Sequence, residues 1–206
     1  MTTLFLLSPA RCGGVRAAQL AASRTSPLGK ELRAGTAALG DVFAWLSALY
    51  FRGKLAYARA FDAPSPGSPG ALVMAPGLGL RTPETAIDAQ ALREMGTVEV
   101  ESDAFVAKLH ADALRVSRDI SAGTNVVLLG SIATGKYVDT LIEVFGARLM
   151  FPALFVGRGD MSRGGVMLRA ARSGDELEYA MVAGAQRRGT RPPKLPPTSR
   201  TRPGSA

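Results

Sequence analysis

The chain has 206 residues, of which 47% are hydrophobic and 20% are charged. That length and balance are typical of one globular domain with a real core, and they argue against a disordered chain. The lone cysteine, Cys12, rules out an internal disulfide and any multi-cysteine metal site, and the lone histidine, His110, rules out the usual zinc ligand sets. We therefore expect neither a metal site nor a cofactor.

The net charge of +8 is unevenly distributed along the chain. Residues 186–206 hold six basic residues and no acid, so residues 1–185, with 25 − 6 = 19 basic and 17 acidic residues, carry only +2. The same C-terminal segment holds five prolines and almost nothing apolar. We predict a single α/β domain over residues 1–185 and a disordered basic tail over residues 186–206. Such a tail can engage nucleic acid, or it can act only as a solubilising extension.

No apolar stretch approaches the roughly 20 residues that a membrane span needs. The first 14 residues briefly resemble a secretory signal, but no basic residue precedes their short apolar run. We therefore expect a cytoplasmic protein without a membrane partner, and the sequence does not indicate an oligomeric state.

Apolar runs alternate along the chain with segments of helical spacing, which predicts parallel strands connected by helices. The runs are continuous rather than alternating, as in strands that are buried on both faces. Strands are expected at residues 4–7, 72–75, 97–100, 126–129 and 149–157, with an edge strand in 176–182. Helices are expected at 15–24, at two or three places in 25–62, within 82–96, and at 102–120 and 136–146, while residues 166–174 close the domain without an assigned structure.

This pattern predicts a three-layer α/β fold, with a mostly parallel central sheet of about five strands and helices on both faces. In such a sheet, ligands bind beyond the carboxyl ends of the strands. Small and polar residues follow four of the predicted strands, in the segments "SPARCGG", "APGLGL", "GSIATGK" and "GRGDMSRGG". We expect these segments to meet at one edge and to let backbone N–H groups approach a ligand. The glycines assigned to that role are Gly13, Gly14, Gly77, Gly79, Gly130 and Gly135.

The segment "GSIATGKY", residues 130–137, resembles a P-loop between a strand and a helix. A P-loop has Ser or Thr after its lysine to bind Mg²⁺, whereas here Tyr137 follows Lys136. No apolar run ends in a second metal-binding carboxylate, so we expect no hydrolysis of nucleoside triphosphates. We expect the helix N-terminus, Ser131, Thr134, Lys136 and Tyr137 to contact an anion or base, and the alternative is an ordinary tight turn with a solvated Lys136.

The segment "GRGDMSRGG" predicts a polar loop that presents one carboxylate between two guanidinium groups. Asp160 is a candidate general acid or base, and Arg158 and Arg163 are candidates for binding a phosphate or carboxylate. The alternative is a surface loop braced by Arg–Asp pairs.

Cys12 precedes two glycines and a predicted helix. A thiol at a helix N-terminus has a lowered pKa and can act as a nucleophile, and packing in the core is the alternative. In "YFRGKLAYA", Gly53 lies between Arg52 and Lys54 inside a helical region, which indicates either a charged junction between two helices or a ligand that requires glycine there.

The order of these motifs resembles that of uncharacterised small bacterial α/β proteins, which are distantly similar to peroxide-stress and nucleobase-glycosylase-like domains. The corresponding pieces are Ala75 to Leu80 with Pro83, and Gly135 to Tyr137, within a span from residue 3 to about residue 170. The family's Cys-Ser-x-x-Lys is replaced here by residues 10–14. The resemblance implies a nucleotide, nucleobase or nucleic acid as the ligand.

Together, the pattern and the resemblance predict a nucleotide-, nucleobase- or nucleic-acid-handling protein with its pocket at the carboxyl edge of the sheet. If the protein is an enzyme, we expect a metal-independent hydrolase of the glycosylase type. The alternative is a non-catalytic protein that binds nucleic acid or another partner, partly through its basic tail.

Overall fold

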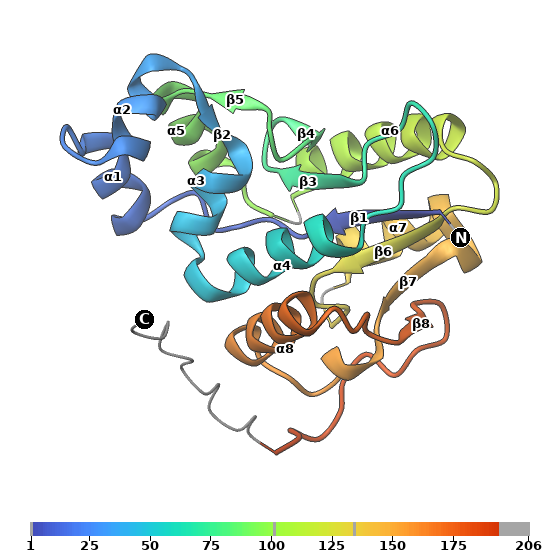
Figure 1. The fold of residues 1–206 in the computed structure, drawn as a ribbon. Helices are drawn as coiled ribbons and strands as arrows, with labels where there is room; N and C mark the ends of the chain where they lie inside the picture. The colour runs from blue at the N-terminus through green and yellow to red at the C-terminus, as the bar shows by residue number, and fades with distance from the viewer. Residues whose placement is uncertain (1, 101, 134, 194–206) are drawn as a thin grey trace.

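The structure is a computed structural model that describes residues 2–100, 102–133 and 135–193 (Figure 1). In this part of the chain, a six-stranded sheet has the order β4-β3-β1-β6-β7-β8. The four central strands are parallel, and the two edge strands β4 and β8 are antiparallel to their neighbours. The strands are β1 (Thr3–Leu7), β3 (Ala71–Ala75), β4 (Gly79–Arg81), β6 (Asn125–Leu129), β7 (Leu149–Pro152) and β8 (Tyr179–Met181). A separate antiparallel pair joins β2 (Ala37–Ala38) to β5 (Ala86–Ile87).

Helices connect the parallel strands and cover the sheet. α4 packs against α8, and α6 packs against α7. Figure 1 shows α4 and α8 below the strands and α6 above them. The helices are α1 (Val15–Ala22), α2 (Pro27–Ala34), α3 (Leu39–Leu46), α4 (Ala48–Phe61), α5 (Ala89–Thr97), α6 (Asp103–Asp119), α7 (Lys136–Phe145) and α8 (Asp160–Ser173). Among the described residues, no helix is both long and apolar enough to cross a membrane.

The predicted α/β class and the mostly parallel sheet are confirmed. Every residue of β1 is buried, because both faces of this central strand are covered, and this explains its continuous apolar sequence. The sheet has six strands where about five were predicted, and one of them, β4 at residues 79–81, is an edge strand where only a turn was predicted.

Other segments also differ from their predicted structures, and the strand predicted over 149–157 ends at Pro152. Residues 97–100 are not a strand: α5 continues through Thr97, and residues 98–100 belong to no strand. The predicted polar loop at 157–165 is helical from Asp160 onwards, as the first turns of α8.

The contact between α4 and α8 depends on two glycines. A Cβ atom on Gly53 would lie 2.7 Å from the carbonyl oxygen of Gly164, and one on Gly164 would lie 2.7 Å from the carbonyl oxygen of Leu49. The two backbones therefore touch directly. The predicted helix junction at Gly53 is wrong, because α4 runs unbroken through this residue, and the close contact with α8 explains the glycine.

The strand order places a topological switch point beside β1. The chain passes from β1 to β3 on one side and then returns to β6 on the other side. The connections leaving β1 and β6 therefore run in opposite directions, which opens a crevice beyond their carboxyl ends.

Candidate functional site

A pocket of about 890 Å³ lies at the carboxyl edge of the sheet, where the switch point predicts one. The loop after β1, the α3–α4 junction, the end of α5, the turn after β6 and the start of α8 all contribute to its walls. The polar or reactive side chains in these walls are those of Ser8, Arg11, Cys12, Ser47, Tyr50, Glu99, Ser131, Tyr137 and Asp160. Segments from both halves of the chain therefore form one concave surface.

Asp160 is the first residue of α8, and Gly159 is the N-cap residue. Its side chain is 65% exposed, and it lies in the pocket wall. Nη1 of Arg163 donates a hydrogen bond to its Oδ1 over 3.3 Å, while Nε of Arg163 donates to the carbonyl oxygen of Phe155. Arg163 is buried, so it braces Asp160 from behind. A carboxylate is also favoured at this position by the helix dipole.

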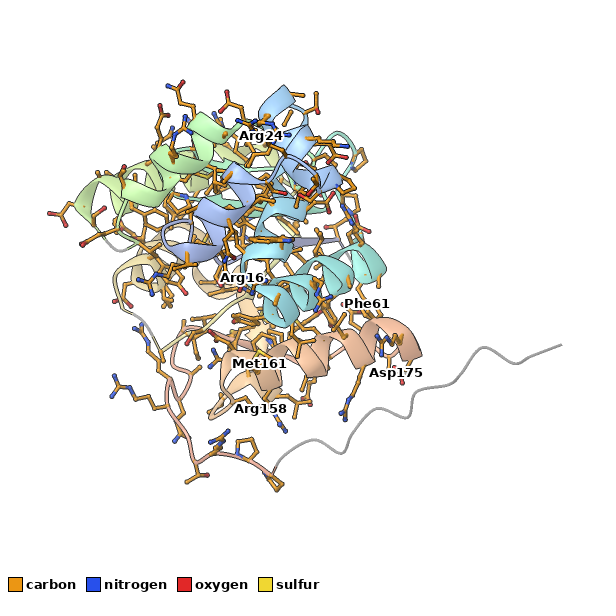
Figure 2. All side chains as sticks on the ribbon, turned by 90° about the vertical axis from the view of Figure 1, so that its left-hand side faces the viewer. Arg16, Arg24, Phe61, Arg158, Met161 and Asp175 are labelled. Atoms are coloured by element: carbon orange, nitrogen blue, oxygen red, sulfur yellow. The ribbon has the colours of Figure 1, made fainter. Side chains whose placement is uncertain are left out.

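Arg158 has a different role from the predicted anion clamp. Its guanidinium donates to the carbonyl oxygen of Leu154 and to Oγ of Ser162, so it closes the turn that leads into α8. Figure 2 shows Arg158 and Met161 beside this end of the helix. Of the three charged residues predicted here, Asp160 is the one that reaches the pocket wall.

Lys54 is a fully buried lysine, with only 1% of its surface exposed. Its Nζ lies 2.7 Å from Oγ and 3.0 Å from the carbonyl oxygen of Ser8, and 3.9 Å from the centre of the Tyr50 ring. Burial lowers the pKa of the Lys54 amine to about 7; the Asp160 carboxylate opposes this shift and the Arg163 guanidinium adds to it. Near neutral pH, the Lys54 amine is therefore uncharged in a large share of the molecules.

Tyr50 lines the pocket beside Lys54, which is not itself among the lining residues. Its ring is buried, and its hydroxyl makes no hydrogen bond of normal geometry to the described residues. Burial raises the pKa of Tyr50, while the Arg163 guanidinium opposes the shift. Tyr50 and Ser47 face the pocket because one helix ends and the next begins between α3 and α4, where Ala48 has a φ of +45°.

The turn from Gly130 to Tyr137 is built differently from a P-loop. The Tyr137 hydroxyl donates to the carbonyl oxygen of Ser131 over 3.0 Å, so the residue in the place of a magnesium-binding hydroxyl closes the turn. Ser131 and Tyr137 both line the pocket. Gly130 lies against Ser8, and Gly135 is the N-cap residue of α7.

The structure does not test two of the ligand contacts predicted for that turn. Thr134 is not among the described residues, and of Lys136 only its position as the first residue of α7 is described.

Cys12 lines the pocket together with Gly13 and Gly14, but the predicted lowering of its pKa is wrong. The thiol is buried and donates to the carbonyl oxygen of Ala10 over 3.4 Å. Burial raises the pKa of Cys12 to about 12, so the thiol stays protonated at neutral pH. Gly13 has a packing role, because a Cβ atom there would lie 3.0 Å from the carbonyl oxygen of Gly96.

Gly77 and Gly79 shape the hairpin between β3 and β4, with φ values of +75° and +84°. Gly79 also lies over Asp112 of α6, whose Oδ2 would be 2.0 Å from an added Cβ atom. Neither glycine is among the pocket-lining residues, although Pro76 is. The turn and the close contact explain both glycines without a ligand.

Asp112 itself predicts a measurable effect on stability. Its buried carboxylate accepts a hydrogen bond from the Leu80 N–H over 2.9 Å and pairs with Arg81 and Arg115. Asp112→Ala should lower the free energy of unfolding by about 2 kcal/mol, because it leaves a buried N–H without an acceptor.

Urea unfolding monitored by circular dichroism measures this loss. The control is Asp119→Ala at the exposed end of the same helix, which should change the free energy of unfolding by less than about 0.5 kcal/mol. Equal effects of the two substitutions would contradict the role of Asp112.

The first residues of the predicted tail contact the domain. Arg187 forms an ion pair with Asp139 of α7, and the carbonyl of Thr190 lies against Gly157. Residues 194–206 lie outside the described part of the chain, so the structure does not test the disorder predicted for them.

Sequence reasoning missed Ser8, Tyr50 and Lys54 as a group. A signal was present, because Lys54 lies three and four residues from Tyr50, Phe51 and Ala58, on the apolar face of the helix. A lysine on such a face is buried when the helix packs, and a buried lysine needs a specific partner.

Within the described ranges, no group of three or more His, Cys, Asp or Glu side chains is arranged to hold a metal ion. Comparison of the chain with family models, with curated proteins and with solved structures finds no match. The resemblance to nucleobase-glycosylase-like domains therefore stays a prediction.

Proposed function

We propose that this chain is a three-layer α/β hydrolase of the glycosylase type, which takes a nucleotide- or nucleobase-like molecule in the pocket at its switch point and needs no metal. Asp160 is the proposed general acid or base. The observation that carries the proposal is the position of Asp160: an exposed carboxylate in the pocket wall, held by a buried arginine.

The size and lining of the pocket support a ligand of this class. A volume of about 890 Å³ is near the upper end of the range for small-molecule sites. Ser47, Ser131 and Glu99 in its walls can form hydrogen bonds with a sugar or with the edge of a base. The Tyr137 ring in the wall offers an apolar surface for a planar ligand.

An anionic group has its best partner at the β1 end of the pocket. Arg11 is exposed there and lies close in sequence to Gly13 and Gly14, before the N-terminus of α1. We therefore propose that Arg11 contacts a phosphate, in place of the predicted Arg158 and Arg163.

The test is Asp160→Asn, measured by chromatography of the free base released from a panel of nucleosides and nucleotides. We expect a loss of hydrolysis of about 10²- to 10⁴-fold, because general acid–base catalysis contributes that much. A compound that binds in the pocket should also raise the melting temperature of the wild-type chain, because it binds only the folded state.

The matched control is Asp175→Asn, an exposed aspartate just beyond the other end of α8, which should hydrolyse the same compounds at the wild-type rate (Figure 2). Ligand binding without turnover in the wild-type chain would favour a non-catalytic pocket. Unchanged turnover in Asp160→Asn would remove Asp160 from the mechanism.

A further inference from the structure

The environment of Lys54 is unusual for a lysine that only packs. On its own helix, the rings of Tyr50 and Phe51 lie 3.9 Å and 5.4 Å from its Nζ. Directly after β1, Ser8 offers its carbonyl oxygen and its Oγ as hydrogen-bond partners of Nζ. From α8, Asp160 and Arg163 act on it electrostatically with opposite signs. The burial cost of this amine is thus met mainly by one serine.

The direction of the two hydrogen bonds depends on whether the amine is charged. The carbonyl oxygen of Ser8 can only accept, so it takes one N–H of Lys54 in either state. An ammonium group would also donate to Oγ of Ser8, whereas a neutral amine has a lone pair that accepts the Oγ–H. Nζ and Oγ lie 2.7 Å apart, and when the amine is neutral this is the geometry of a nucleophile beside its base.

Ser8 can reach a substrate, whereas Lys54 acts from behind it. Ser8 lines the pocket as the first residue after β1, but Lys54 is not among the lining residues. Gly130 holds the serine from the side of β6, because a Cβ atom there would lie 2.7 Å from Cβ and 2.9 Å from Oγ of Ser8. The hydroxyl is thus confined between the amine, the β6 backbone and the pocket.

We propose that Ser8 and Lys54 form a nucleophile–base pair, which gives this pocket an acyl-transfer activity toward small carboxylic esters. This activity goes beyond the proposed glycosylase function and does not require a nucleotide as the ligand. A serine paired with a lysine base is one of the known alternatives to a Ser-His-Asp triad, and it needs no histidine.

The step balances with the groups present. Oγ of Ser8 forms a bond to the carbonyl carbon of the ester, while its proton passes to the lone pair on Nζ of Lys54. When the tetrahedral intermediate collapses, the C–O bond to the alcohol breaks, and the alcohol takes the proton from Nζ. Water then attacks the acyl-serine, its proton passes through Nζ to Oγ, and the carboxylic acid leaves.

The test uses the full chain, a fluorophosphonate that phosphonylates reactive serines, and p-nitrophenyl acetate as the ester. We expect one adduct by intact mass, mapped to Ser8 by peptide mass spectrometry. Ser8→Ala and Lys54→Met should each lower labelling and ester hydrolysis at least about 100-fold. Ser173→Ala, at the far end of α8, should react at the wild-type rate. An adduct on another residue, or normal labelling of Lys54→Met, would overturn the proposal.

The pH dependence keeps the proposal testable if either variant fails to fold. The labelling rate of the wild-type chain should rise with pH and reach half of its maximum near pH 7, because the neutral amine is the base. The Asp160 carboxylate raises the pKa of Lys54, so the midpoint should move to lower pH in Asp160→Asn. A flat profile, or an unmoved midpoint, would refute Lys54 as the base. Neither result depends on the release of a nucleobase, so the two proposed activities fail separately.

Discussion

Replacing Gly53 with alanine is expected to lower the free energy of unfolding by about 3 kcal/mol, the upper range for overpacking. The new methyl group would lie 2.7 Å from the carbonyl oxygen and 2.9 Å from Cα of Gly164, and backbone atoms in two packed helices cannot move aside separately. The loss is expected even though alanine favours a helix over glycine by about 1 kcal/mol. Urea unfolding measures the change.

Two further variants sharpen this test. Gly164→Ala should have a similar effect, but the double variant should lose less than the sum, because one methyl group already separates the helices. Gly123→Ala adds the same methyl group where nothing lies within 4 Å, so it should change stability by less than about 0.5 kcal/mol. Full additivity at Gly53 and Gly164 would contradict a shared contact.

The second large effect is on stability as a function of pH. The pKa of Lys54 is about 7 in the folded chain and 10.5 as the unperturbed value, so between these values the unfolded state binds more protons. Stability therefore rises with pH through this window. From pH 7 to pH 9, the gain from Lys54 should be about 2 kcal/mol.

The upper limit of the window is set by other groups. Burial raises the pKa of Cys12 from 9.0 to about 12, so above pH 9 the folded state keeps a proton that the unfolded state loses, and this contribution offsets the gain from Lys54. Urea unfolding at pH 7, 8 and 9 should show a rise in the wild-type chain that is absent in Lys54→Met. Parallel pH dependences in the two chains would show that Lys54 is not neutralised by folding.

The parallel strands were predictable because burial on both faces leaves a local mark in the sequence, such as the four apolar residues from 126 to 129. The edge strand β4 was not predictable in this way, because Gly77 and Gly79 around its turn have the composition of a loop. Its pairing is decided by the antiparallel contact with β3. Strand order likewise depends on contacts between segments far apart in the sequence.

The start of α8 shows how tertiary packing overrides local preference. Gly164 and Gly165 weaken a helix, and they led to the prediction of a polar loop. The helix forms because α4 covers this surface, and the glycine that weakens it locally allows the close contact.

The candidate site was predictable in its location but not in its chemistry. The rule that ligands bind beyond the carboxyl ends of strands leads to Cys12, Ser131 and Asp160, which the fold brings into one pocket wall. The Ser8–Lys54 contact joins residues 46 positions apart, and only the packing of α4 on β1 creates it.

The short antiparallel strands at both ends of the sheet also bear on how the protein behaves in a concentrated solution. A long, straight edge strand offers a row of free backbone groups that a second molecule can extend into an aggregate. Here each edge strand is three residues long, and on β4 the N–H of Leu80 is already bound by the carboxylate of Asp112. The same aspartate that anchors β4 to α6 thus takes away a backbone donor that a foreign strand would need.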